Sequence, residues 1–209
     1  MNPQIHIAGT TRTGKTTLAV NLVEALKKMG RNAVALDVDF TRVTTFGSDE
    51  PALGSLRPNE NPEDKVKFDL QKKMQLWSYN NVFDLQIPII TAAGAIPIFT
   101  ATHAWGPTYD RVKAVADKLG NKLRFILLEE TSLDEMARRC MTDEKSKSDM
   151  SGDPRENQTL LANWMDITKR IHLAYDNFAQ PICRIPQGTP EEMTQAALAY
   201  ILNGEAASA

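Results

Sequence analysis

The chain has 209 residues, of which 42% are hydrophobic and 24% are charged, with a net charge of -2 and a pI near 6.0. These values are typical of a soluble globular protein with room for one α/β domain, and the net charge argues against general affinity for nucleic acid. No apolar run reaches the ~18 residues of a membrane span, and the two cysteines have neither a disulfide-framework nor a zinc-site spacing.

A short apolar strand is predicted over residues 5–8. It leaves no room for a signal peptide, and with so few cysteines we expect a cytoplasmic protein. Residues 9–16 follow and read Gly-Thr-Thr-Arg-Thr-Gly-Lys-Thr, which matches the phosphate-binding (Walker A) loop G-x-x-x-x-G-K-[ST]. A helix over residues 17–29, ended by Gly30, completes the context that this loop requires.

A bound triphosphate explains the spacing of the loop. Two glycines let the backbone curl so that its N–H groups point at an anion, and the helix behind adds its positive end. Lys15 would reach the β- and γ-phosphates, and the Thr16 hydroxyl would bind Mg²⁺, so we expect ATP and Mg²⁺ as cofactors. The alternative is a turn that only caps a helix. The predicted nucleotide-binding residues are Gly9, Thr11, Thr13, Gly14, Lys15, Thr16 and Thr17.

The second predicted strand, residues 32–38, has a continuous apolar run that is typical of a parallel strand covered on both faces. Asp37 and Asp39 stand at its carboxyl end, where ligands of parallel sheets bind. Because side chains alternate along a strand, we expect both carboxylates to face the loop together. One would hold Mg²⁺, with Asp37 as the expected ligand, and one would accept the proton of an attacking hydroxyl. Which acid is the base stays open.

Arg42 follows these acids and suits a planar anionic group on the acceptor. The alternative is that Asp37 and Asp39 only bind loop N–H groups, with Arg42 as their counter-ion. Phe40 and His103 are further candidates for contact with the acceptor, and their alternatives are hydrophobic cover and a solvated loop side chain.

The later elements continue the alternation of helices and strands. A long loop over residues 43–62 should overhang the site. Pro88 predicts a kink or a fresh start in the helix that follows, and Gly94 predicts its end. This helix begins at Pro62 and should carry on one face Val66, Leu70, Met74, Trp77 and Asn81. The other predicted strands are 95–101, 123–128 and 181–185, and the other helices are 107–119, one from Ser132, 159–178 and 190–202. Capping boxes pair Ser132 with Glu135 and Thr189 with Glu192.

This order predicts an α/β, P-loop NTPase fold with a mostly parallel five-stranded sheet and helices on both faces. We expect one domain over residues 1–204, with a polar lid at 141–158 and a tail at 205–209. Arg139 and Arg155 flank or lie in the lid and are the candidates that would neutralise charge on the transferring phosphoryl group. Their alternative is a solvated helix end.

Three segments resemble the adenylylsulfate kinase branch of the P-loop small-molecule kinases, within the nucleoside monophosphate kinase-like fold. They are the loop 9–16, residues 36–42, which resemble the family's L-D-G-D-N-x-R, and residues 106–111, which are similar to its S-P-Y-x-x-D-R. Residues 133–139 also resemble a family segment whose last arginine packs near the adenine. The resemblance implies an ATP-dependent kinase that phosphorylates a hydroxyl of a small, anionic molecule. The family's adenylylsulfate-binding segments have no counterpart here, which leaves the acceptor open.

Two other functions stay open. Nucleotide-dependent switch proteins carry D-x-x-G after the third strand and N-K-x-D at the end of a later strand, and neither motif stands at its place here. A polynucleotide or toxin-like kinase needs a basic groove, which the net charge of -2 does not favour. We therefore expect a small-molecule acceptor and no membrane or nucleic-acid partner. The oligomeric state is open, with a homodimer as one option.

Overall fold

The computed structural model describes residues 3–10, 12–47, 62–101, 107–129 and 182–203, with single residues and pairs between 132 and 173. Some predicted features lie outside these residues: Thr11, the loop from residue 48 to 61, His103, the tail, and the predicted lid apart from Arg155 and Gln158.

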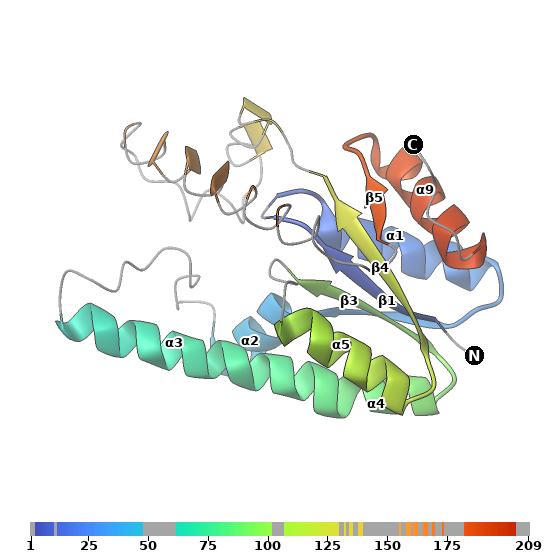
Figure 1. The fold of residues 1–209 in the computed structure, drawn as a ribbon, viewed down its shortest axis with the longest axis horizontal. Coiled ribbons are helices and arrows are strands. Elements are labelled where there is room, and N and C mark those ends of the chain that lie inside the picture. The colour runs from blue at the N-terminus through green and yellow to red at the C-terminus, as the bar shows by residue number, and fades with distance from the viewer. Residues whose placement is uncertain are drawn as a thin grey trace.

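Five parallel strands form one sheet in the order β2-β3-β1-β4-β5 (Figure 1). They are β1 (Pro3–Ala8), β2 (Ala33–Asp37), β3 (Ile96–Ala101), β4 (Lys122–Leu128) and β5 (Cys183–Ile185). This confirms the predicted α/β fold. Because all strands run the same way, their carboxyl ends meet at one edge, and the loop after β1 leaves the centre of that edge.

Helices cover both faces of the sheet, as predicted (Figure 1). On β3, Ile96 and Ile98 pack with α1 (Lys15–Lys28) and α9 (Pro190–Asn203), whereas Phe99 packs with the opposite layer. That layer contains α4 (Ile87–Ala92) and α5 (Pro107–Lys118). Alternation along the strands sends neighbouring side chains to opposite faces, so each face builds its own core. No helix in the described part of the chain has the length and apolarity to cross a membrane.

The second strand is covered on both faces, but less completely than predicted: Ala33 packs against the core that contains α1 and α9, and Leu36 belongs to the opposite core. β2 lies at the edge of the sheet, where Ala35 is exposed and the exposed fraction of Val34 is 39%. An apolar run indicates a strand but does not distinguish a central strand from an edge strand that is only partly covered.

The chain turns directly from β2 into a helix, α2 (Val38–Phe46). The predicted loop over 43–62 is therefore wrong for its first four residues, which are helical. Gly47, with a φ of 99°, ends α2 in a conformation that favours glycine. A short helix thus stands at the carboxyl edge of the sheet, next to the loop after β1.

The predicted irregularity near Pro88 takes the form of a π-helix. The helix α3 (Pro62–Asn80) runs into a π-helical turn, Asn81–Gln86, and then into α4, with Pro88 in its first turn. A proline removes one i→i−4 hydrogen bond, and the wider turn before it accommodates that loss. Within this turn, Gln86 Nε2 donates to Asn81 Oδ1, five residues back, over 2.6 Å.

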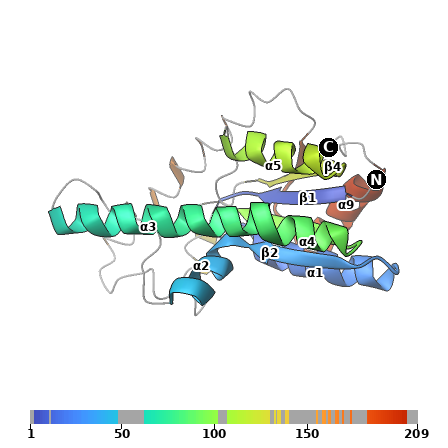
Figure 2. The same ribbon diagram turned by 90° about the horizontal axis from the view of Figure 1, so that it is seen from below.

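The predicted buried face of the long helix is wrong at Val66, Leu70 and Trp77. The exposed fraction is 70% for Val66, 50% for Leu70 and 42% for Trp77, and only Met74, at 8%, is buried. For Val66 and Leu70 the reason is visible in Figures 1 and 2: the amino-terminal part of α3, which holds both residues, projects beyond the sheet, so the sheet does not cover it.

Candidate nucleotide-binding site

The loop between β1 and α1 has the backbone that its glycines predict. Gly9 has a φ of 149° and Gly14, which precedes the first residue of α1, has a φ of 91°. A Cβ on Gly9 would lie 2.8 Å from Thr13 Oγ1 and 3.2 Å from the carbonyl oxygen of Leu128. The Thr13 hydroxyl in turn donates to the carbonyl of Thr10 over 2.9 Å. The loop is therefore packed too closely against itself and against β4 to admit a side chain at Gly9.

Lys15 is partly buried at the start of α1, and its ammonium donates to the carbonyl oxygen of Thr10. Burial lowers the pKa of Lys15 to about 8, against the opposing effect of the nearby Asp39 and Asp37. Near neutral pH the side chain is mainly charged, but its charge is poorly solvated. A phosphate group beside Lys15 would supply the missing compensation.

Asp37 connects the loop to β2. Its Oδ2 accepts a hydrogen bond from the Thr16 hydroxyl over 3.0 Å. Its Oδ1 accepts from the backbone N–H groups of Asp39, over 2.8 Å, and Phe40, over 3.1 Å, so Asp37 is also the N-cap of α2. Two alternatives were open for Asp37: a role at the phosphate loop, or a bond to nearby backbone N–H groups. The Asp37 carboxylate does both, with one oxygen for each.

The predicted shared strand face of Asp37 and Asp39 is wrong. β2 ends at Asp37, and Asp39 lies in the first turn of α2, where it is exposed. Asp39 is still near the loop: the charge of its carboxylate raises the pKa of Lys15, against the effect of burial. The two acids thus come together through a helix cap and not through strand alternation.

Phe40 and Arg42 lie on opposite sides of α2. The exposed fraction of Phe40 is 66%, whereas that of Arg42 is 9%, on the inward face that Val38 also occupies. Within the described residues, no carboxylate forms an ion pair with Arg42. A buried guanidinium without a carboxylate partner is costly unless an anion approaches it.

A second group of side chains, which come from residues 135–139 and from Gln187, contacts the loop between β1 and α1. Glu135 accepts hydrogen bonds from Arg138 (2.7 and 2.6 Å) and from Arg139 Nε (2.7 Å). Arg139 Nη1 donates to the carbonyl oxygen of Arg12 over 2.8 Å and to Gln187 Oε1 over 3.2 Å. Arg139, predicted to act on the transferring phosphoryl group, is thus bonded to the loop backbone. The Arg138 and Arg139 bonds hold the pKa of Glu135 low, at about 2, so Glu135 is ionised at neutral pH.

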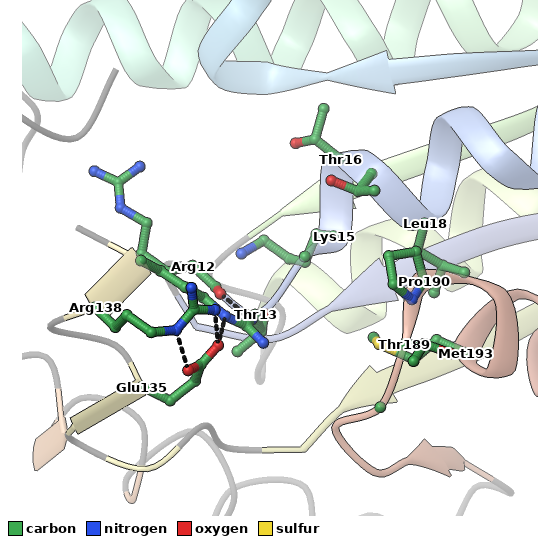
Figure 3. A pocket seen from close by; sticks show the side chains of 14 residues that line it. Arg12, Thr13, Lys15, Thr16, Leu18, Glu135, Arg138, Thr189, Pro190 and Met193 are labelled. Carbon is green, nitrogen blue, oxygen red and sulfur yellow. Dashed lines mark hydrogen bonds and ion pairs between the residues drawn. The ribbon is translucent and has the colours of Figure 1, made fainter. Parts of the chain in front are cut away.

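These elements enclose a pocket of about 720 Å³ (Figure 3). Glu135 and Arg138 lie toward one end of it, and Thr189, Pro190 and Met193 lie at the other. The sequence identifies Thr189 only as a cap, and its box with Glu192 is confirmed, with bonds of 2.8 to 3.2 Å. The place of residues 188–190 and Met193 in the pocket was not predicted. Their position after the carboxyl end of β5, the same edge as the loop, was the available signal.

The remaining candidates fall into two groups. Thr11 and His103 lie outside the described residues. Arg155 is described, is helical and exposed, and is not among the residues that line the pocket.

The family of the chain follows from its sequence match. The model of the CobQ/CobB/MinD/ParA nucleotide-binding domain matches residues 5–166, more than half of the chain. The chain belongs to this family. The match begins in β1 and includes the loop, Asp37 and the described residues from Glu135 to Arg139. The CobQ/CobB/MinD/ParA assignment therefore fits the interpretation of this edge of the sheet as a nucleotide site. No curated protein sequence matches the chain.

Solved structures with a similar fold include kinases at low sequence identity. A shikimate kinase from Acinetobacter baumannii, in complex with shikimate, has a TM-score of 0.60 and 20% identity, over 98% of this chain and 95% of that one. The Mycobacterium tuberculosis APS kinase, in complex with AMPPNP and APS, has a TM-score of 0.56 and 14% identity, over 97% and 98%. A gluconokinase from Sinorhizobium meliloti 1021 has a TM-score of 0.56 and 14% identity, over 96% and 92%. At these identities the likeness establishes the fold alone.

Proposed function

We propose that this chain binds ATP with Mg²⁺ and transfers the γ-phosphoryl group to a hydroxyl of a small anionic acceptor. The observation that carries the proposal is the 3.0 Å contact between Thr16 of the loop and Asp37 at the end of β2. It brings a carboxylate to the position where a phosphate-bound cation would be held, directly beside Lys15.

The loop and the pocket would hold the nucleotide. Lys15 and the N–H groups of the loop would bind the phosphates, and the positive end of α1 would add to their attraction. The pocket of about 720 Å³ beside Thr17 and Pro190 has the size of a small-ligand site and would accept the nucleoside. Binding at this edge agrees with the CobQ/CobB/MinD/ParA family match.

The donors at the loop fit a magnesium ion. Thr16 and Asp37 offer a hydroxyl and a carboxylate oxygen, the ligand type that Mg²⁺ prefers. The described residues contain no group of three acidic, histidine or cysteine side chains around one point. This agrees with an ion bound by one carboxylate, phosphates and water, and not by a protein cage. When bound, the ion would neutralise part of the phosphate charge.

Asp39 and Arg42 would act on the acceptor. Asp39 is exposed, near Lys15, and its carboxylate does not cap a helix, so it is available to take a proton from a hydroxyl. Arg42 lies one turn along α2, buried and without a carboxylate partner among the described residues. An anionic group on the acceptor would pair with it, which is why we propose a phosphate, sulfate or carboxylate on that molecule. Phe40, on the opposite side of α2, would not cover a group bound to Arg42.

A second candidate is a nucleotide-dependent switch that hydrolyses its triphosphate slowly and transfers nothing. The family match favours it, because the family is described by nucleotide binding and not by transfer. The two candidates share the loop, Lys15 and Thr16, and they differ in what Asp39 and Arg42 do.

The test is a transfer assay with ATP and Mg²⁺ and a panel of sulfated, sugar-acid, nucleoside and oligonucleotide acceptors, in which ADP release is measured. A kinase should release ADP rapidly with one acceptor class, and the product should carry the phosphate. Slow hydrolysis that no acceptor changes would contradict the proposal and favour the switch.

Variants separate the roles of the two acids. Lys15→Ala should abolish turnover, and Asp37→Asn and Asp39→Asn should keep ADP affinity but lower transfer by about 10²-fold or more. The matched control is Asp117→Asn, which removes an exposed carboxylate on α5 that pairs with Lys113. Full transfer activity in both Asp37→Asn and Asp39→Asn would show that the assigned chemistry is wrong.

A further inference from the structure

Arg12 is the one residue other than glycine with a positive φ among those that the structure describes. Its φ of 69° lies in the left-handed region, where the Cβ of an L-residue crowds a carbonyl oxygen. The other positive-φ positions of the loop, Gly9 and Gly14, hold glycine, which adopts such conformations without steric cost. The chain therefore keeps a long cationic side chain where glycine would be less strained.

Side chains from outside the loop brace this conformation. Arg139 Nη1 donates to the carbonyl oxygen of Arg12 over 2.8 Å, and Glu135 holds the same guanidinium over 2.7 Å. At the next residue, Gln187 Nε2 lies 3.5 Å from the carbonyl oxygen of Thr13 and donates to the residue after β4, Glu129, over 2.8 Å. A strained backbone conformation persists only where surrounding contacts hold it in place, and such positions cluster at functional sites.

The side chain of Arg12 is partly exposed and lines the pocket with Lys15 (Figure 3). Its positive charge contributes to the lowered pKa of Lys15, so the two cations lie within electrostatic reach of each other. A phosphate group that lies beside both cations is attracted by both of them. The described lining of the pocket holds one acidic side chain, Glu135, and four basic ones: Arg12, Lys15, Arg138 and Arg139.

We propose that Arg12 recognises the terminal phosphate of the bound triphosphate. The inference rests on the proposed function of this site. A guanidinium binds phosphate oxygens through a planar fork of donors, which the ammonium of Lys15 lacks. Lys15 and the loop N–H groups would bind the phosphates that ADP and ATP share, whereas Arg12 would contact the γ-phosphoryl group. In transfer, the bond from the γ-phosphorus to the bridging oxygen breaks, the acceptor oxygen forms the new bond, and Asp39 takes the hydroxyl proton.

The test compares the affinities of the full chain for ADP and AMPPNP, with Mg²⁺, by isothermal titration calorimetry. Wild type should bind AMPPNP more tightly than ADP. Arg12→Gly should change the ADP Kd by less than about twofold and weaken AMPPNP by about ten- to a hundredfold, the range of charge-assisted hydrogen bonds. Arg12→Lys keeps the charge without the fork and should restore only part of the loss. Arg31→Ala, just after the end of α1 that lies far from the loop, should change neither affinity.

Thermal melting separates recognition from a structural role. Arg12→Gly should change the melting temperature little, because the relief of the left-handed strain offsets the loss of the contacts of the arginine side chain. A large drop in melting temperature, or an equal loss of ADP and AMPPNP affinity, would overturn the proposal. So would wild-type protein that binds neither nucleotide.

The transfer assay makes the two failures distinguishable. If no acceptor is phosphorylated but Arg12→Gly still loses its preference for AMPPNP, the role of Arg12 stands and the kinase reaction fails. If wild type transfers phosphate and Arg12→Gly transfers it at the same rate, the kinase reaction stands and the role of Arg12 fails.

Discussion

Gly9 has less room for a side chain than any other glycine with a positive φ in the described chain. Its added Cβ would lie 2.8 Å from Thr13 Oγ1, and the backbone oxygen of Leu128 at 3.2 Å cannot move without disturbing β4. We expect Gly9→Ala to lower the free energy of unfolding by about 2–3 kcal/mol, through the crowding and the φ of 149°. Chemical denaturation measures this change.

The control for Gly9 is Gly120→Ala. Gly120 has a φ of 65°, but no atom lies within 4 Å of its added Cβ. Gly120→Ala should lower the free energy of unfolding by only the cost of an L-residue in the left-handed conformation, about 1–2 kcal/mol. It should leave nucleotide affinity unchanged. An equal loss of unfolding free energy in Gly9→Ala and Gly120→Ala would mean that the close approach of Gly9 to Thr13 and Leu128 does not affect stability.

The lowered pKa of Lys15 predicts that nucleotide binding takes up a proton above neutral pH. In the free protein Lys15 loses its proton as the pH rises through about 8, and a bound phosphate favours the charged form. Uptake at Lys15 should therefore be about a tenth of a proton at pH 7 and close to one at pH 9, and affinity should fall over this range. Calorimetry in buffers of different ionisation enthalpy measures the uptake.

The lowered pKa of Lys15 also affects the stability of the ligand-free protein, which should rise with pH where nucleotide affinity falls. Between about pH 8 and the usual lysine value of 10.5, the unfolded chain binds more protons at Lys15 than the folded chain does. The contribution of Lys15 to stability without ligand therefore rises with pH over this window. Lys28→Met, at the exposed end of α1, should change neither proton uptake nor this trend. Uptake at pH 9 no larger than at pH 7 would contradict the assigned burial of Lys15.

At the scale of elements, Asp37 is both the N-cap of α2 and a residue of the proposed nucleotide site. Asp37 accepts from two N–H groups of α2 with one oxygen and from Thr16 with the other. Asparagine keeps the cap but removes the charge, so Asp37→Asn should change stability by only a few tenths of a kcal/mol, whereas Asp37→Ala should cost about 1 kcal/mol. Both should lose Mg²⁺-dependent turnover. Denaturant midpoints and turnover, measured on the same samples, separate the cap from the charge.

The elements also show which structural features a sequence can specify. The loop was predictable, because the glycine spacing, the preceding strand and the following helix all depend on neighbouring residues. The position of Asp39 was not, because nothing in the apolar run marks the change from β2 to α2 after one residue. The exposure of Leu70 was not predictable either, since it depends on how far α3 projects beyond the sheet.

At the scale of the whole molecule, the site is assembled from segments far apart in the sequence. Gln187, after β5, contacts the loop of β1 and the residue after β4, and Arg139 contacts both Gln187 and the loop. Such contacts link the two ends of the chain across the sheet. No local pattern predicts them, because they depend on the strand order β2-β3-β1-β4-β5, which places β5 next to β4 at the loop's edge.

This assembly predicts that nucleotide binding stabilises the whole fold and not only the loop. A ligand present at 100 times its Kd adds about 2.7 kcal/mol to the free energy of unfolding, which corresponds to a rise of roughly 5–10 °C in Tm for a domain of this size. Scanning calorimetry with ADP and Mg²⁺ should therefore show one transition that moves as a unit. The nucleotide-dependent rise in Tm should be absent in Lys15→Ala and unchanged in Lys28→Ala. If only part of the transition moved, the contacts of Gln187 and Arg139 would not couple the loop to the core.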